Sequence, residues 1–152
     1  MEIIQVQTGT EEFYKTCNYI EQNITFENLR ENGGTLNYSG LTYNSNILLI
    51  ALENDAPVGY NSVIASPDSY YIYQIAVKKS FQRKGIGTKM MEKAIEMADS
   101  KNLFVTAHVR DYNIASQRMF LKLGFIKANN RKNGLYILNQ KSRRDNQIPA
   151  QR

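Results

Sequence analysis

The most informative stretch of the sequence is Ile75-Ala76-Val77-Lys78-Lys79-Ser80-Phe81-Gln82-Arg83-Lys84-Gly85-Ile86-Gly87-Thr88. It opens with an apolar, β-like triplet, passes through a basic turn and reaches two glycines. From Gly85 to Ser100 the apolar residues recur every three or four positions, which is typical of a helix with one buried face. The segment therefore predicts a strand, a basic loop and the start of a helix.

The start of this helix is a predicted anion site. Gly85 and Gly87 have no Cβ, so a ligand can approach their backbone closely. The first turn of any helix has unpaired N–H groups and the positive end of the helix dipole. Thr88 adds a hydroxyl, and Arg83 and Lys84 add positive charge. A run of charges alone is more often a solvated loop face, but the glycines favour a bound pyrophosphate.

Two common phosphate motifs are excluded by their spacing. A P-loop needs a second glycine five residues from Gly85, and positions 80 and 90 are Ser and Met. The dinucleotide fingerprint needs a third glycine where Met90 stands. What remains is Gln-x-x-Gly-x-Gly after a strand, beginning at Gln82.

Working outward, the rest of the chain predicts an α/β sandwich with a mixed sheet. A helix is expected from Glu11 onward, with Thr10 as its N-cap, and a second short helix over Asn113–Leu123. Residues 27–45 are rich in Asn and Gly and read as a loop or a short helix. Strands are expected over 46–53, 58–65, 69–77, 103–109, 125–128 and 135–138. The strand–helix–strand unit of residues 69–109 should be a right-handed parallel crossover.

Composition limits the class of protein. The 152 residues predict one domain, residues 1–140, followed by a basic, flexible tail of residues 141–152. No apolar run approaches the length of a membrane span, and no secretory signal is visible, so a cytoplasmic location without membrane contact is expected. One Cys and one His predict neither a disulfide nor a metal site, and Cys17 reads as core packing. The net charge of +5 lies largely in a tail without aromatics, so a nucleic-acid partner is not expected.

Two blocks of the sequence resemble the GNAT family of N-acetyltransferases. Residues 82–87 are similar to the family's acyl-CoA pyrophosphate loop, and Ile75-Ala76-Val77 resembles its fourth strand. The Asn-led segment Asn113–Phe125, which ends in Gly124-Phe125, is similar to its second block. The resemblance covers residues 46–138. It implies a mixed, mostly antiparallel sheet flanked by helices, with a central parallel strand–helix–strand unit.

The resemblance also implies acetyl-CoA as acyl donor and a set of residues that contact it. A backbone N–H on the strand Ile75–Val77 would polarise the thioester carbonyl. Asn113 would contact the coenzyme arm and also serve as an N-cap. The expected contacts to the coenzyme are Ile75, Ala76, Val77, Gln82, Arg83, Lys84, Gly85, Ile86, Gly87, Thr88, Asn113, Ser116 and Phe120.

The proton-transfer groups do not follow the family's pattern. The Tyr that often protonates the leaving thiolate is replaced by Phe120, which cannot donate and is expected to pack against the pantetheine arm. Tyr112 and Ser116 are the candidate catalytic hydroxyls, and Tyr73 is a weaker one. His108 is a candidate base or a structural strand residue, and Gln74 stands where some relatives carry an acid.

We therefore expect an enzyme that moves an acetyl group from acetyl-CoA to a primary amine by direct attack in a ternary complex. Small amines, amino acids and a protein N-terminus remain open as acceptors. The replacement at Phe120 motivates the alternative, a non-catalytic acyl-CoA-binding module. An edge strand could pair with a second copy, and the sequence leaves a homodimer open.

Overall fold

The computed structural model describes residues 1–25, 46–110, 113–132 and 135–140. In these residues, three α-helices accompany seven strands; the helices are α1 (Glu11–Ile20), α3 (Ile86–Ser100) and α4 (Ile114–Lys122). The π-helical turn η1 (Glu21–Thr25) extends α1, and the 3-10 turn η3 (Lys79–Phe81) precedes α3. The strands are β1 (Glu2–Val6), β2 (Ile47–Glu53), β3 (Ala56–Ala65), β4 (Ser69–Val77), β5 (Phe104–Arg110), β6 (Phe125–Lys132) and β7 (Leu135–Gln140).

The strands form one sheet in the order β1-β2-β3-β4-β5-β7-β6. Every neighbouring pair is antiparallel except β4 and β5, which are parallel and joined through α3. This confirms the predicted mixed sheet and its central strand–helix–strand unit. Strand β1 was not expected, and β7 rather than β6 lies next to β5. Both features depend on pairing between segments far apart in sequence.

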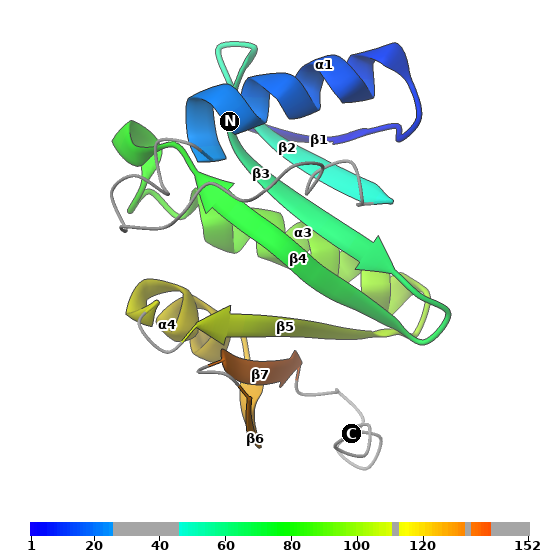
Figure 1. Ribbon diagram of the computed structural model, residues 1–152, viewed down its shortest axis with the longest axis vertical. Coiled ribbons are helices and arrows are strands. Elements are labelled where there is room, and N and C mark those ends of the chain that lie inside the picture. The colour runs from blue at the N-terminus through cyan, green and yellow to red at the C-terminus, as the bar shows by residue number, and fades with distance from the viewer. Residues whose placement is uncertain (26–45, 111–112, 133–134, 141–152) are drawn as a thin grey trace.

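The two faces of the sheet are covered by different helices (Figure 1). Along β2 the side chains alternate. Leu48 and Ile50 pack in one cluster with Phe13, Cys17 and Ile20 of α1. Ile47 and Leu49 point the other way and join Met91, Ala94 and Ala98 of α3. We call the two sides the α1 face and the α3 face. Cys17 is fully buried in the α1-face cluster, as its core role predicted.

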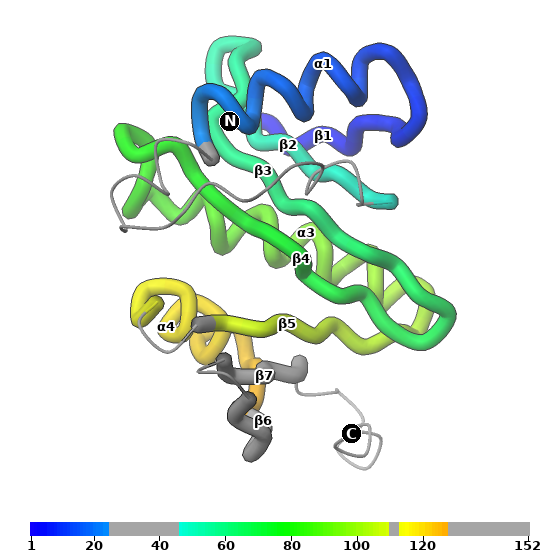
Figure 2. The backbone as a smooth tube through the Cα atoms, in the orientation of Figure 1, coloured from blue at the N-terminus to red at the C-terminus, as the bar shows by residue number. Residues whose placement is uncertain are grey.

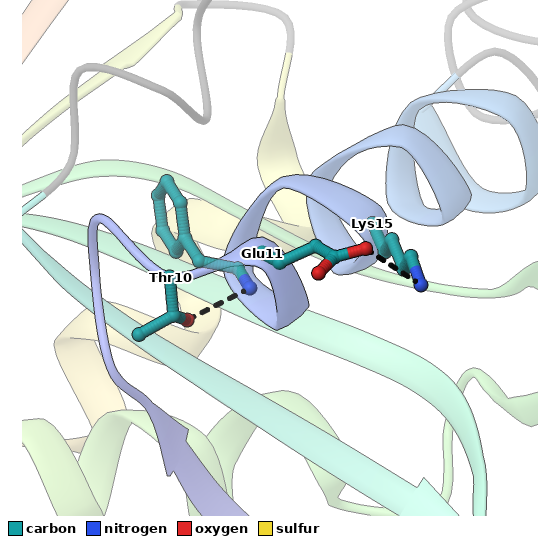
Figure 3. A network of polar contacts seen from close by, with 4 residues as sticks. Thr10, Glu11 and Lys15 are labelled. Atoms are coloured by element: carbon teal, nitrogen blue, oxygen red, sulfur yellow. Dashed lines mark hydrogen bonds and ion pairs between the residues drawn. The ribbon is translucent and has the colours of Figure 1, made fainter.

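The first helix begins as its sequence predicts (Figure 3). The Thr10 side-chain oxygen accepts a hydrogen bond from the backbone N–H of Phe13 at 3.1 Å. Glu11 and Lys15, one turn apart, form an exposed ion pair at 3.1 Å. Such a pair contributes little to stability, whereas the cap satisfies one of the orphan amides of the first turn. The apolar periodicity continues into η1, where Ile24 is fully buried.

Candidate functional site

The central feature of the site is the divergence of β4 from β5. The two strands pair only from Ser69 with Phe104 to Ile72 with Ala107, and within the described residues no ladder joins them beyond that point. In Figure 2 the two tubes start close together and separate toward their C-terminal ends. The predicted residues Ile75, Ala76 and Val77 lie in this part of β4. Strand β3 pairs with one edge of this segment of β4, and the other edge of the segment faces the gap between β4 and β5.

A β-bulge marks the place where β4 leaves β5. Ser62 of β3 pairs with Gln74, but its neighbour Val63 pairs with Ile72, so Tyr73 is an extra residue in β4. A bulge bends its strand and changes which face the following side chains occupy. Ile72 packs on the α3 face before the bulge, and Ile75 packs on that same face after it.

The basic loop after β4 is folded back on the strand end. The backbone N–H of Lys78 donates to the Val58 carbonyl at 2.7 Å, and the short turn η3 follows. The Gln82 side-chain Nε2 donates to the Val77 carbonyl at 2.9 Å. Gln82, predicted as a coenzyme contact, therefore holds the loop to the end of β4. This hydrogen bond fixes the distance between the strand end and the first turn of α3.

The first turn of α3 has the features of an anion site. Its N-cap is Gly85, with φ at 80°, so the cap position has no side chain to accept a hydrogen bond from the first amides. Arg83 also has a positive φ, 64°, and both Arg83 and Lys84 are exposed. The Lys84 ammonium lies 5.2 Å from the centre of the Phe81 ring. Free amides, a helix dipole and two exposed cations together suit a diphosphate.

The second glycine, Gly87, has a packing role. A Cβ at this position would lie 3.3 Å from the Met119 Sδ of α4 and 3.8 Å from a Val77 methyl. The absence of a side chain therefore lets the start of α3 approach α4 and the end of β4 closely. Ile86 is buried and Thr88 is half-buried. Both stay predicted coenzyme contacts through their backbone and hydroxyl groups.

The second predicted block starts α4 at the end of β5. The Asn113 side-chain oxygen accepts a hydrogen bond from the Ser116 backbone N–H at 3.2 Å, which confirms the N-cap role. Ser116 is half-buried. Phe120 is 2% exposed and belongs to the α3-face core. Its ring packs edge-on against that of Phe125, with 4.9 Å between the ring centres. Its contact with a pantetheine arm stays a prediction. Tyr112 lies outside the described residues.

Beside the bulge, on the α1 face, the structure places two residues that the sequence analysis missed, Tyr71 and Ser62, next to the predicted candidates Tyr73, His108 and Gln74. The centre of the Tyr71 ring lies 6.2 Å from the centre of the Tyr73 ring and 5.4 Å from that of His108, and both pairs are edge-on. Burial, and to a smaller degree the charge of Tyr73, raise the pKa of the Tyr71 hydroxyl above its usual value. Ser62 lies nearby on β3, opposite Gln74. The one available signal for Ser62 was the polar pair Asn61-Ser62 within a mostly apolar strand.

No group of three or more His, Cys, Asp or Glu in the described part of the chain could hold a metal ion. Among the same residues, no helix is both long enough and apolar enough to cross a membrane.

The comparisons with known proteins identify the family. Residues 8–125 match the model of the Acetyltransferase (GNAT) family, so the chain belongs to that family. This confirms the resemblance of the two sequence blocks and the fold class that it implied.

Curated relatives match over a shorter stretch. The L-2,4-diaminobutyric acid acetyltransferase of Shouchella clausii (strain KSM-K16) is 33% identical over 85 residues, 53% of this chain and 48% of that protein. The enzyme of the same name from Marinococcus halophilus is 30% identical over 79 residues, 49% of this chain and 46% of that protein. The matched stretch thus spans about half the length of these relatives.

Solved structures share the fold over nearly the whole chain. The PaiA N-acetyltransferase from Thermoplasma acidophilum, in complex with coenzyme A, has a TM-score of 0.73 at 13% identity and covers 93% of this chain and 100% of its own. The ribosomal-protein-S18-alanine N-acetyltransferase from Escherichia coli has a TM-score of 0.71 at 17% identity and covers 91% of this chain and 93% of its own. At these identities the likeness concerns the fold.

Proposed function

We propose that the protein is an N-acetyltransferase that uses acetyl-CoA and a primary amine in one ternary complex. The observation that supports it is the divergence of β4 from β5 beside a helix that begins at a glycine. The divergence exposes a strand edge whose N–H groups can face a carbonyl. The helix start can take the diphosphate of the coenzyme.

The coenzyme fits the residues present. Amides from Gly85 to Thr88 would hold its diphosphate, with Arg83 and Lys84 adding charge. Asn113 and Ser116, at the start of α4, would contact the arm that carries the thioester. Bound acetyl-CoA supplies an activated acetyl group.

The reaction then requires little from side chains. The amine nitrogen attacks the thioester carbon, and a backbone N–H between Ile75 and Val77 donates to the oxygen as it becomes negative. The C–S bond breaks, and the electron pair leaves with sulfur. A thiol near pKa 8.5 is a tolerable leaving group, so a proton from Ser116, Tyr112 or water suffices. The amine loses one proton as the C–N bond forms, and this proton passes to water, which balances the proton given to the thiolate.

The acceptor is a further part of the proposal. L-2,4-Diaminobutyric acid is the first amine to test, because curated relatives that match about half of this chain carry that substrate in their names. Small monoamines and a peptide with a free N-terminus complete the panel. The test is calorimetric titration with acetyl-CoA, followed by measurement of thiol release with each amine. A protein that does not bind acetyl-CoA is not this enzyme.

The second candidate function is a non-catalytic acyl-CoA-binding module, favoured by the aromatic core residue at Phe120. Tight acetyl-CoA binding without thiol release on any amine would support the module. The variant Phe120→Tyr separates a missing acid from a dispensable one. We expect unchanged turnover and a stability loss of about 1–3 kcal/mol, because the added hydroxyl enters a packed core. A sharp rise in turnover would show that the missing acid limits the enzyme.

A further inference from the structure

Among the described residues, four buried side-chain polar atoms have no hydrogen-bond partner; Asn61 Oδ1 and Tyr70 Oη are two of them, and the other two lie on the α1 face beside the β4 bulge. These last two are the Ser62 Oγ, on a residue that is 0% exposed, and the Gln74 Oε1. Buried polar atoms in folded proteins are nearly always paired, because leaving them unpaired costs free energy. Two orphans on neighbouring strands therefore call for an explanation in terms of what they bind.

The two atoms come from residues that lie directly opposite each other. Ser62 of β3 pairs with Gln74 of β4, and side chains at such positions are close enough to share a partner. Both lie on the α1 face, because Tyr60, two residues before Ser62, and Ala76, two residues after Gln74, pack against the α1 cluster. The bulge at Tyr73 places Gln74 on this face. Regular alternation along β4, without a bulge, would place it on the α3 face with Ile72.

The position of the pair relates it to the proposed chemistry. Gln74 immediately precedes Ile75, the first residue of the strand segment whose amides would polarise the thioester. The half-buried rings of Tyr71 and Tyr73 lie beside it on β4. The flanking strand residues on this face include no carboxylate, Lys or Arg: they are Tyr60, Ala76, Tyr71, Tyr73 and the exposed His108 of β5, which contacts the Tyr71 ring.

We propose that Ser62 Oγ and Gln74 Oε1 accept hydrogen bonds from the N–H groups of the acceptor amine. This inference rests on the proposed transferase function and names how that site selects its substrate. Two uncharged oxygens in a desolvated setting favour an uncharged amine over an ammonium ion, because burial disfavours the charged form. The neutral amine is the form that attacks a thioester. The proton of the ammonium goes to bulk water before the amine binds, and no carboxylate base is required.

The test uses Gln74→Met, which keeps the side-chain length but removes the amide, and Ser62→Ala. The expected result is a rise of about tenfold in the KM for the amine, the loss expected for one hydrogen bond. The Kd for acetyl-CoA should change less than about twofold, since neither side chain is at the α3 start. The Tm should not fall, because each change removes an unpaired buried atom.

Matched controls make the same changes away from the bulge. Gln5→Met alters an exposed glutamine on β1, and Ser100→Ala alters an exposed serine at the end of α3. Neither should change the KM. Gln74→Glu restores an oxygen acceptor, so its KM should be nearer to wild type than that of Gln74→Met. This recovery would not occur if residue 74 only filled space.

The outcomes separate this inference from the proposed function. Active wild type with unchanged KM in both variants overturns the acceptor pair and leaves the transferase intact. A fall in Tm together with loss of acetyl-CoA binding also overturns it, because the role is then structural. Wild type that acetylates no amine overturns both the pair and the transferase.

Discussion

Two helices begin where β4 and β5 end, and they begin differently. Helix α4 starts at Asn113, whose side chain accepts a hydrogen bond from its own first turn. Helix α3 starts at Gly85, which has no side chain and a φ of 80°. The first helix, α1, resembles α4 in this respect, with Thr10 as its cap. Two of the three α-helices in the described part of the chain therefore use side chains to satisfy first-turn amides, and the third does not.

The difference shows how helix ends can be divided between stability and binding. A side-chain cap is worth about 1 kcal/mol to a protein, so its absence is a cost. At α3 that cost leaves several N–H groups and the helix dipole available to an anion, next to Arg83 and Lys84. The comparison predicts that changes at α3 affect ligand binding and that changes at the other caps affect mainly stability.

The largest expected effect comes from Gly85→Asp. Its carboxylate would place a negative charge at the first turn and repel the diphosphate, so the affinity for acetyl-CoA should fall about 100-fold. Gly9→Asp is the matched control, because Gly9 has nearly the same φ, 81°, and is exposed before α1. Calorimetry on both variants checks the prediction. Equal affinity in wild type and Gly85→Asp would remove the distinction between the two helix starts.

The second effect concerns the charges before α3. Arg83→Gln and Lys84→Gln should each lower acetyl-CoA affinity about tenfold at low salt, and less at high salt because the interaction is screened. Lys93→Gln, an exposed lysine in the middle of α3, is the control and should bind normally. Titrations with acetyl-CoA at two salt concentrations measure both the loss of affinity and its dependence on salt. A loss that does not depend on salt would contradict a charge role.

The third prediction concerns the Asn113 cap of α4. Asn113→Ala should lower the free energy of unfolding by about 1 kcal/mol. If the Asn113 amide also contacts the coenzyme arm, the affinity should fall about threefold, which is within the range for one weak contact. Asn113→Asp retains an oxygen cap but loses the amide N–H groups. Denaturant unfolding should then return to wild type while the affinity stays low, and recovery of both would assign Asn113 to capping alone.

The smallest effect on binding is expected at α1. Thr10→Ala removes the oxygen that accepts the Phe13 N–H and caps α1, so the free energy of unfolding should fall by about 1 kcal/mol. The affinity for acetyl-CoA should change less than about twofold, since α1 packs far from α3 on the other face of the sheet. Thr10→Ser restores the oxygen and provides the control. A large affinity loss in Thr10→Ala would mean that caps and binding are not separate.

Local sequence predicted the elements whose chemistry is local. The Thr10 cap, the strand Ser69–Val77 and the helix after Gly85 follow from residues next to each other in the chain. The expected strands 46–53 and 58–65 likewise correspond to β2 and β3, which a turn at Asn54 and Asp55, both with positive φ, joins. The division at residue 140 stays a prediction.

The face beside the bulge could not be predicted in this way. Strict alternation along β4 places Gln74 on the same side as Ile72, and one extra residue at Tyr73 reverses this. The bulge depends on register with β3, which sequence spacing does not reveal. Strand β1 was missed for a similar reason. It is a strand because it pairs with β2, which begins only at residue 47, and the local sequence does not reveal such a distant partner. The expected helix or loop at residues 27–45 lies outside the described residues.

The most direct test follows the backbone amides of the first turn of α3 by NMR during titration. With acetyl-CoA, the amides of Gly85, Ile86, Gly87 and Thr88 should show the largest shifts in the protein. With S-acetyl-pantetheine, which lacks the diphosphate, they should stay near their free positions. If these four amides respond equally to both compounds, or to neither while acetyl-CoA binds elsewhere, the uncapped start of α3 is not the diphosphate site.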